Sequence, residues 1–527
     1  SKLASLQTFG PQIGFNYLGR FESSSHESNQ WRMAEGGLIA AQDEADRARI
    51  HLLDINTAIN PQGLLDISIS FCRHAHTESD IADLADRFQE MLNILSAHCL
   101  EAPLKNRRSR SDFETLQQST TLAQAIDQGI IDTLANTYPD FEDLVPLTSL
   151  QQGLAFETLS LEKGATDPYH VHLLLTFTGQ LDHDAMQRAW RGLVKRHTAL
   201  RLAIAPPALV GGLGIVLNEE AIDYQTVFLT GTPAERIQTL KAMDFARPFE
   251  LNQGPLIRLY EAELGNNAWA VLISNHHLIL DGWSLPILTG DLAQLYQAEC
   301  DGKTLSLPKP FDWKAHLQWL DQQDLSSAHN YWKQYLSELT TPSRLDLPAP
   351  VEQGVGMKNI EVVLDDTATK ALDTFTKQYG LTQASVLQGL FALILARRSK
   401  LDEIVIGSVR NGRTSSLAGI DRGVGLFINT LPMYTSLEPG EVLVDWIQEQ
   451  QVAMADQNTH GHIGLREIQQ IIGMGGTPLF EAMFVFENYP VDQTATTIGQ
   501  LTLTDAQSED GNHYPIGLSA LTGEVLT

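Results

Sequence analysis

The chain of 527 residues is too long for one ordinary core, and its 43% hydrophobic and 19% charged residues are typical of a globular protein with two to four domains or lobes. Its formal net charge is −28, from 64 acidic and 36 basic residues. Such a surface repels phosphate backbones, so we expect no nucleic-acid partner and a preference for neutral or cationic ones.

Hydrophobic runs and the number of cysteines indicate the cellular compartment of the protein. No apolar run reaches the roughly eighteen residues that span a bilayer, so we expect no membrane association. Residues 1–5 lack the basic-then-apolar order of a signal peptide. Cys72, Cys99 and Cys300 are too few and too scattered for a disulfide framework or a zinc site. We therefore predict a cytoplasmic location, with the three thiols buried as small apolar residues.

Residues 50–100 predict a strand, a turn, a second strand and a helix. Apolar side chains alternate over 53–55 and again over 65–69, as they do in strands. Over 81–95 they recur at helical spacing, and Ser79-Asp80 precede them as a helix cap.

Residues 101–140 are polar and irregular at first, and we predict a linker with a short helix around 122–134. The basic run 105–110 is best interpreted as a solvated part of this linker. Short isolated basic runs are weak indicators of nucleic-acid binding.

A new unit begins near Phe141 and alternates strands with helices. A strand is predicted over 171–177, and a helix capped by Asp182 follows, with His197 on its apolar face as a packed, hydrogen-bonded residue. A continuous apolar strand over 269–274 precedes a helix with leucines at 285, 288, 292 and 295.

A second lobe is predicted after the proline-rich stretch 341–350. It contains a helix over 386–396, a strand over 404–409 and a helix over 442–454. Strands interspersed with helices of ten or more residues indicate the α/β class.

The strongest chemical signal is the run His276-His277-Leu-Ile-Leu-Asp281-Gly282 at the end of the strand predicted over 269–274. Side chains alternate along a strand, so one imidazole can face a reaction channel while its neighbour packs as support. A neutral imidazole is suited to accept a proton at neutral pH. Gly282 would let the backbone turn tightly and bring an N–H close to a developing oxyanion.

Two other interpretations of the histidine pair stay open on the residues alone. A buried histidine pair is often hydrogen-bonded core, and histidines are common metal ligands. Adjacent strand residues point apart, so His276 and His277 are poorly placed to share one ion, and no third ligand stands at a recognised spacing. We therefore expect no metal.

Six segments resemble the motifs of nonribosomal peptide synthetase condensation domains, and they occur in family order over about 385 residues. They comprise 144–154, 196–201, 274–284, 311–320, 406–413 together with 424–432, and, more loosely, 460–465.

The resemblance implies an α/β fold of two lobes, like chloramphenicol acetyltransferase, arranged as a V-shaped pseudo-dimer with a tunnel between the lobes. Upstream and downstream peptidyl carrier proteins would dock at opposite mouths and present acyl and aminoacyl groups as phosphopantetheine thioesters, with no cofactor bound by the domain itself. The acceptor amine would attack the donor carbonyl and form an amide.

The resemblance also implies roles for individual residues. His277 would orient or deprotonate the amine, with His276 and Gly282 completing the catalytic group. Asp281 would be structural, paired with Arg413. Four further residues would line the tunnel or pack beside it: Trp283, Asn275, Ser284 and Asn429.

Residues 13–21 resemble the terminal motif of epimerization domains, and the segment up to Cys99 matches the end of such a domain. Its histidine loop and catalytic glutamate motif are missing, so this piece is not expected to epimerize a substrate. The resemblance predicts four parts: 1–100 as a C-terminal epimerization fragment, 101–140 as linker, 141–330 as the N-terminal lobe and 331–527 as a truncated C-terminal lobe.

A condensation domain that follows an epimerization domain normally takes a D-configured donor and an L-configured acceptor, and the run Leu280–Pro286 looks like that subclass. The chain is expected to be incomplete at both ends, as part of a larger synthetase with neighbouring domains. Residues 50–100 could then fill the vacant place in the last lobe.

Two rival functions remain. One is a coenzyme A-dependent acyltransferase, which shares the His-x-x-x-Asp-Gly core. The other is a catalytically silent docking module of the same fold. Heterocyclization is disfavoured because it needs aspartates where His276 and His277 stand, and epimerization because a Glu-Gly-His-Gly-Arg-Glu run is missing.

Overall fold

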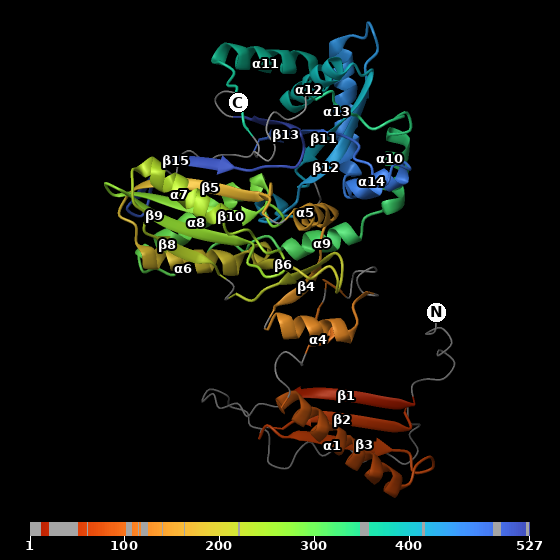
Figure 1. The fold of residues 1–527 in the computed structure, drawn as a ribbon. Helices are drawn as coiled ribbons and strands as arrows, with labels where there is room; N and C mark the ends of the chain where they lie inside the picture. Colours follow the sequence, from red (N-terminus) through yellow and green to blue (C-terminus); the bar gives the residue numbers. More distant parts are fainter. Residues whose placement is uncertain are drawn as a thin grey trace. The chain divides into compact units, whose positions relative to one another are not determined.

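The computed structural model describes residues 12–20, 51–60, 62–101, 108–113, 115–116, 125–139, 141–162, 164–219, 222–347, 358–413, 417–488, 497–522 and 526. The chain divides into two compact units, Ser1–Arg107 and Arg108–Thr527, which are described separately with the labels of Figure 1. Parts of several sequence features lie outside the described residues, among them Phe21 of the epimerization motif, 105–107 of the basic run and 348–350 of the proline-rich stretch.

The first unit is a three-stranded sheet followed by a helix, and the two strands and the helix predicted over 50–100 account for all of it except β1. Strands β1 (Ile13–Arg20), β2 (Leu53–Ile59) and β3 (Leu65–Phe71) lie in that order, with β1 parallel and β3 antiparallel to β2. Helix α1 (Glu78–Glu101) follows. Its cap differs from the prediction, because Thr77 Oγ1 accepts a hydrogen bond from Asp80 N and Asp80 Oδ2 accepts one from Thr77 N.

The segment expected as a linker is, from Arg108 onward, part of the second unit. Phe113, Leu116 and Ile126 are buried in one core cluster with the inner face of α4 (Gln128–Thr137) and with residues of β7. Helix α4 begins later than expected, at the N-cap Asp127, whose side chain accepts from Ile130 N. Residues 122–124 of the predicted helix lie outside the described residues.

The N-terminal lobe of the second unit contains a six-stranded sheet in the order β14-β15-β5-β10-β9-β8. The strands are β5 (His170–Gly179), β8 (Tyr224–Val227), β9 (Ile257–Gly265), β10 (Ala268–His276), β14 (Thr497–Ile498) and β15 (Leu501–Glu509). The apolar strands predicted over 171–177 and 269–274 are thus confirmed as β5 and β10.

Alternation along β5 and β10 places helices on both faces of this sheet (Figure 1). Leu173 and Leu175 pack in one cluster with α6 (His183–Arg196) and α8 (Leu285–Cys300). Leu174 instead faces α7 (Pro233–Phe245). This lobe also has a smaller sheet, with the strands in the order β4 (Asp143–Pro146), β7 (Leu213–Val216) and β6 (Leu202–Ile204). Helix α5 (Ser149–Leu159) follows β4 in the chain.

The C-terminal lobe is built on a four-stranded sheet in the order β12-β11-β13-β16. The strands are β11 (Glu403–Arg410), β12 (Asn429–Ser436), β13 (Ala482–Glu487) and β16 (Ile516–Leu521). The helices nearby in the chain are α9 (Trp313–Asp321), α10 (Leu325–Tyr335), α11 (Asp366–Tyr379), α12 (Gln383–Ser399), α13 (Leu443–Thr459) and α14 (Leu465–Ile471). The predictions over 386–396, 404–409 and 442–454 correspond to α12, β11 and α13.

Two parts of the chain, the β14–β15 hairpin and helix α10, depart from a lobe boundary at residue 330. Strands β14 and β15 come from the C-terminal segment but extend the N-terminal sheet, where Leu501 pairs with Gly179. Helix α10 straddles the boundary, and Trp332 packs with Val405 and Leu431 of the C-terminal sheet. Both elements therefore tie one lobe to the other.

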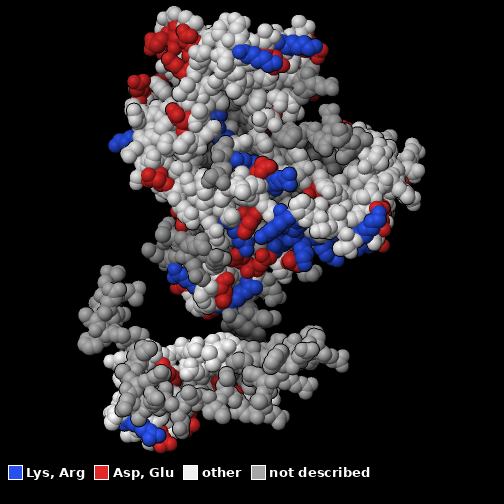
Figure 2. Space-filling model, turned by 180° about the vertical axis from the view of Figure 1, so that it is seen from behind, with Lys and Arg blue, Asp and Glu red and all other residues white. Residues whose placement is uncertain are grey.

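Cysteine exposure, helix apolarity and surface charge each bear on a prediction made from the sequence. Cys99 and Cys300 are exposed and Cys72 is partly buried, so the expectation of three buried thiols was wrong. Among the described residues no single helix has the length and apolarity to cross a membrane, and one pair, α11 with α12, meets the test together but is bent by 103°. On the face shown in Figure 2, basic side chains of the second unit lie among acidic ones, unlike the continuous basic surface of nucleic-acid-binding proteins.

Candidate active site

The histidine motif lies between β10 and α8, and the neighbouring strand fixes where it starts. β10 ends at His276, which is paired in antiparallel register with His170 of β5. One residue later, the backbone N–H of His277 donates to the carbonyl oxygen of Tyr169 at 2.8 Å. The chain then enters a short 3₁₀ helix, η5 (Gly282–Ser284), which leads into α8. The loop is therefore held by the strand before it and the helix after it.

His277 faces a cavity of about 1610 Å³ between the two lobes. The N-terminal lobe contributes α5, β5, the histidine loop and α8, and the C-terminal lobe contributes β13, β16 and residues near them. The His277 ring is half-buried, and its buried Nδ1 has no hydrogen-bond partner among the described residues. Nε2 is therefore the nitrogen available to a ligand.

His276 is fully buried and does not line the cavity. Its Nδ1 accepts a hydrogen bond from Leu278 N at 3.0 Å, so Nε2 carries the proton and faces Thr158 Oγ1 at 3.0 Å and Asp167 Oδ2 at 3.2 Å. Burial lowers the pKa of His276, which keeps the ring neutral. This ring holds the loop and does not line the cavity, whereas the motif resemblance placed it in the catalytic group.

Asp281 and Arg413 form the expected ion pair, and it joins the two lobes. The guanidinium binds both carboxylate oxygens, at 2.8 and 2.9 Å, and both side chains are almost fully buried. The carboxylate also accepts from Ser284 N, Ser284 Oγ and Phe427 N, at 2.8 to 3.0 Å. Every strong acceptor site of Asp281 is thus used inside the protein, and the residue lies outside the cavity lining.

Of the four residues expected to line a tunnel, Trp283 alone lines the cavity, next to Gly282. Asn275 is buried in the sheet, and Ser284 Oγ donates to Asp281 and accepts from Gly425 N. Asn429 donates to two backbone carbonyl oxygens, at positions 461 and 463. These last three side chains are used inside the protein and are not part of the lining. Gly282 opens η5, and its φ is not among the positive values found in the described residues, so the expected tight turn needs no special glycine conformation.

Two further buried histidines lie within motif segments, His197 in 196–201 and His316 in 311–320. His197 caps the C-terminus of α6 and its Nε2 lies 2.9 Å from Asp291, as a packed and satisfied residue should. His316 packs against Trp319 and Phe427, and burial lowers the pKa of His316 to about 4.

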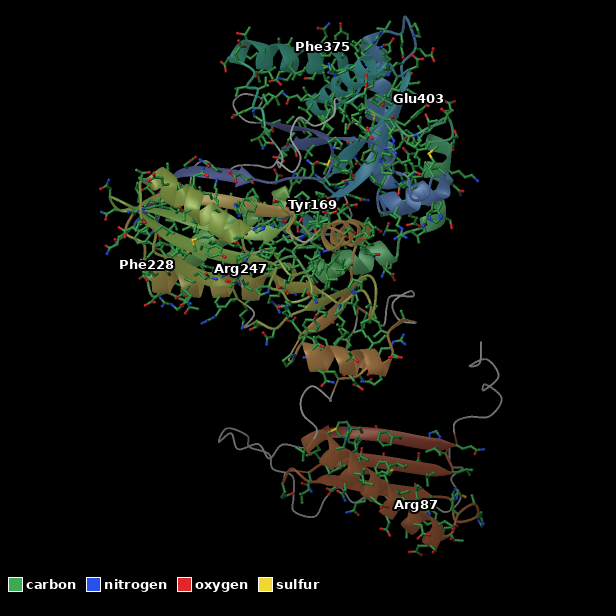
Figure 3. All side chains as sticks on the ribbon, viewed as in Figure 1. Arg87, Tyr169, Phe228, Arg247, Phe375 and Glu403 are labelled. Atoms are coloured by element: carbon green, nitrogen blue, oxygen red, sulfur yellow. The ribbon has the colours of Figure 1, made fainter. Side chains whose placement is uncertain are left out.

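The sequence interpretation missed the side chains that hold the loop. Gln151 Nε2 donates to Leu278 O at 3.0 Å, and Thr158 and Asp167 hold His276. The carbonyl oxygen of Tyr169 accepts a hydrogen bond from the His277 N–H, and Tyr169 lies where the two lobes meet (Figure 3). Pairing the two predicted strands in antiparallel register would have indicated Asp167 and Tyr169, because both come just before β5.

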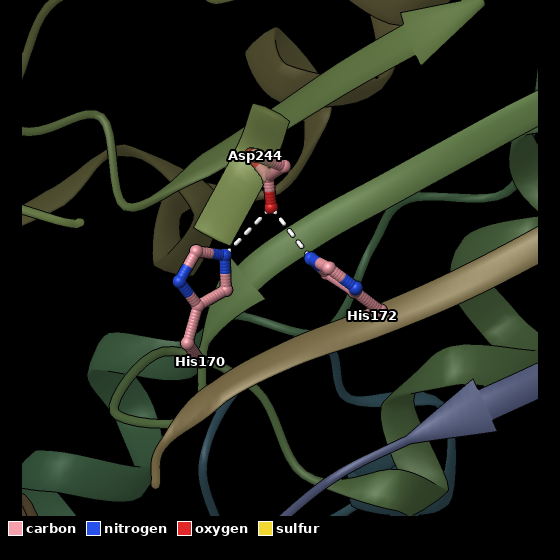
Figure 4. Close-up of side chains that lie close together, drawn as sticks. All are labelled: His170, His172 and Asp244. Carbon is pink, nitrogen blue, oxygen red and sulfur yellow. Dashed lines mark hydrogen bonds and ion pairs between the residues drawn. The ribbon is translucent and has the colours of Figure 1, made fainter. Parts of the chain in front are cut away.

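A second buried histidine cluster has the side chains of a metal site (Figure 4). Ligand atoms of His170, His172 and Asp244 lie within 4.8 Å of one another, and both imidazole Nε2 atoms donate to Asp244 Oδ2 at 2.6 Å. Ser274 Oγ donates to the same oxygen, and the guanidinium Nε of Arg258 lies 3.0 Å from Oδ1. Burial raises the pKa of Asp244, but the hydrogen bonds from the imidazoles outweigh it and hold the pKa well below its usual range. The buried guanidinium of Arg258 would repel a divalent cation at this position, so the geometry favours a hydrogen-bonded cluster.

Comparison with known proteins identifies the family. The model of the Condensation domain family matches residues 141–525, most of the chain. The chain belongs to the condensation domain family. Enzymes of this family are acyl or peptidyl transferases that form amide bonds in nonribosomal peptide synthetases.

Curated relatives are much longer than this condensation domain chain. It is 29% identical to one linear gramicidin synthase protein of Brevibacillus parabrevis over 518 residues, which are 96% of this chain and 6% of the relative. It is 27% identical to bacitracin synthase 3 of Bacillus licheniformis over 534 residues, which are 98% of this chain and 8% of the relative. The chain thus spans less than a tenth of the length of these relatives.

Solved condensation domains share the fold. The starter condensation domain of rhizomide synthetase matches with a TM-score of 0.60 and 19% identity, over 72% of this chain and 87% of that one. The first condensation domain of the calcium-dependent antibiotic synthetase matches with a TM-score of 0.58 and 20% identity, over 72% and 88%. The α/β fold of two lobes expected from the motifs is therefore confirmed.

Proposed function

We propose that this chain joins a carrier-bound acyl or peptidyl thioester to the amine of a carrier-bound aminoacyl thioester. The observation that carries the proposal is the half-buried His277 ring lining a cavity to which both lobes contribute. The amine nitrogen attacks the thioester carbonyl carbon, the C–N bond forms and the C–S bond breaks. The proton lost by the amine passes to the departing phosphopantetheine thiolate.

His277 is proposed to accept a hydrogen bond from the amine through Nε2 and to hold it in line with the carbonyl. An α-ammonium has a pKa near 8, so orientation contributes at least as much as proton removal. The Gly282 N–H is proposed as a donor to the oxyanion, since this glycine lines the same cavity. His276, Asp281 and Arg413 are proposed to hold the loop.

The donor is proposed to be D-configured and residues 1–100 to be the end of an epimerization domain. Two observations support this. The strand β1 contains residues 13–20 of the segment that resembles the epimerization motif. In addition, the alignment with the linear gramicidin synthase protein covers 96% of the chain, so it extends beyond 141–525 into the N-terminal unit. Carrier proteins and neighbouring synthetase domains are the proposed partners, in the cytoplasm.

Two separately produced carrier proteins, loaded with defined aminoacyl groups, test the proposed reaction. We expect dipeptidyl thioester on the acceptor carrier, detected by mass spectrometry, and little product when the donor is a coenzyme A thioester. Product from coenzyme A thioesters alone would favour the acyltransferase rival. Binding of both carriers without product from either source would favour the silent docking module.

Donor stereochemistry is tested with the same assay. We expect a D-aminoacyl donor to be coupled in preference to its L epimer by at least about tenfold in kcat/KM, a difference of about 1.4 kcal/mol. Each carrier is loaded with one epimer at equal occupancy, and initial rates are compared. Equal rates for the two epimers contradict the D-donor assignment and leave amide formation itself intact.

A further inference from the structure

A second histidine, His513, lines the same cavity as His277 and comes from the other end of the chain. It follows β15, in the segment 510–515, which lies against the residues before β5. A Cβ atom at Gly511 would come within 2.7 Å of the Pro168 carbonyl oxygen. Only glycine permits this close approach, which brings the His513 ring to Tyr169.

Tyr169 connects the two histidines. Its hydroxyl is hydrogen-bonded to His513 Nδ1, and its backbone carbonyl accepts from the His277 N–H at 2.8 Å. The Tyr169 ring also lies 6.1 Å from the His276 ring and 6.0 Å from the His513 ring, measured between centroids. A displacement of His513 would therefore also move the histidine loop, because Tyr169 is hydrogen-bonded to both.

The proton positions follow from burial. Tyr169 is 3% exposed, and desolvation, with the nearby Tyr514 and Glu157, raises the pKa of its phenol, which therefore stays protonated. His513 Nδ1 is the partner of this hydroxyl among the described residues. If Nδ1 carried the proton, the buried phenol O–H would lack an acceptor, so the phenol donates and the imidazole proton lies on Nε2.

We propose that His513 presents its Nε2–H in the cavity as a hydrogen-bond donor to a carbonyl oxygen of a carrier-bound thioester, with Tyr169 fixing the tautomer. This rests on the proposed function, and it makes His513 a positioning residue beside His277. An Nε2–H donor needs a hydrogen-bond acceptor as its ligand, and the carbonyl oxygen of an acyl or peptidyl thioester is such an acceptor. Desolvation lowers the pKa of His513 by more than the nearby Glu157 raises it, which favours the neutral ring.

His513→Leu, His513→Gln and Tyr169→Phe test the proposal in the two-carrier assay, with donor and acceptor carriers varied separately. His513→Leu is expected to lower kcat/KM by about 10–100-fold, and His513→Gln by less, since its amide keeps an N–H donor. Tyr169→Phe should lower it severalfold and add nothing in the His513→Leu background, because both changes act on one hydrogen bond. A raised KM for one carrier alone tells whether the donor or the acceptor carbonyl is bound.

His329→Gln is the matched control, because His329 is partly exposed, pairs with Glu467 and does not line the cavity. Rates of His513→Leu within twofold of the unchanged chain, or losses for His513→Leu and Tyr169→Phe that multiply in the double variant, overturn the proposal. If His513→Leu melts at a lower temperature, the His513→Gln and Tyr169→Phe results decide. If the unchanged chain forms no dipeptidyl thioester, the proposed function fails first and this inference falls with it.

Discussion

Replacing His277 with alanine is expected to slow dipeptidyl thioester formation by about 10²–10⁴-fold, the range for loss of a general base or an orienting imidazole. The ring lines the cavity, and within the described part of the chain its buried Nδ1 has no hydrogen-bond partner, so removing the ring leaves no described group unpaired. The melting temperature should therefore change little. Single-turnover rates with both carriers loaded measure the effect.

The residual activity of His277→Ala is also expected to depend on pH. Without the imidazole, the rate should rise with pH up to about 8, as the free α-amine loses its proton in solution. His329→Ala serves as control, because it removes a histidine that does not line the cavity. A folded His277→Ala protein with more than about a tenth of the original rate would contradict the assignment.

Asp281→Ala is expected to destabilise the second unit by about 3–5 kcal/mol, because it leaves Arg413 buried without its partner. The N–H of Phe427 and the hydroxyl of Ser284 would also lose an acceptor. Activity should fall together with stability, since the pair connects the histidine loop to the C-terminal lobe. Denaturant unfolding followed by fluorescence gives the change in the free energy of unfolding.

Asp366→Ala is the matched control for Asp281→Ala. Asp366 pairs with Lys370 on the surface of α11, where an ion pair contributes at most about 1 kcal/mol. Asp281→Asn should fall between the two, because an amide oxygen still accepts from Ser284 and Phe427 but does not balance the guanidinium charge. A soluble Asp281→Ala protein that unfolds at the original denaturant concentration would show that the pair is not structural.

The sequence predicted the local elements well, because their signals are local. The alternation in β5 and β10 and the cap at Asp182 of α6 are each read within a dozen residues. The ion pair between Asp281 and Arg413 was expected from family motifs alone, since nothing local joins residues 132 apart.

Long-range arrangement was beyond the sequence for physical reasons. Strand β15 is polar along much of its length and gives no sign that it pairs with β5. His513, which lies between β15 and β16, likewise carries no local signal of a site. Asn275, Ser284 and Asn429 were expected at the cavity because they lie in motifs, but a motif residue can equally be one that holds the loop from behind.

The pairing of β15 with β5 also has a consequence for biosynthesis. The partners Leu501 and Gly179 are made more than 300 residues apart, so at about 5–20 residues per second β5 emerges roughly half a minute before its neighbour. During that interval one side of the nascent sheet exposes unpaired amide and carbonyl groups, which attract other extended chains. Slow translation or premature termination should therefore lower the yield of soluble protein. A chaperone that binds the nascent chain and shields this edge of the sheet should restore the yield.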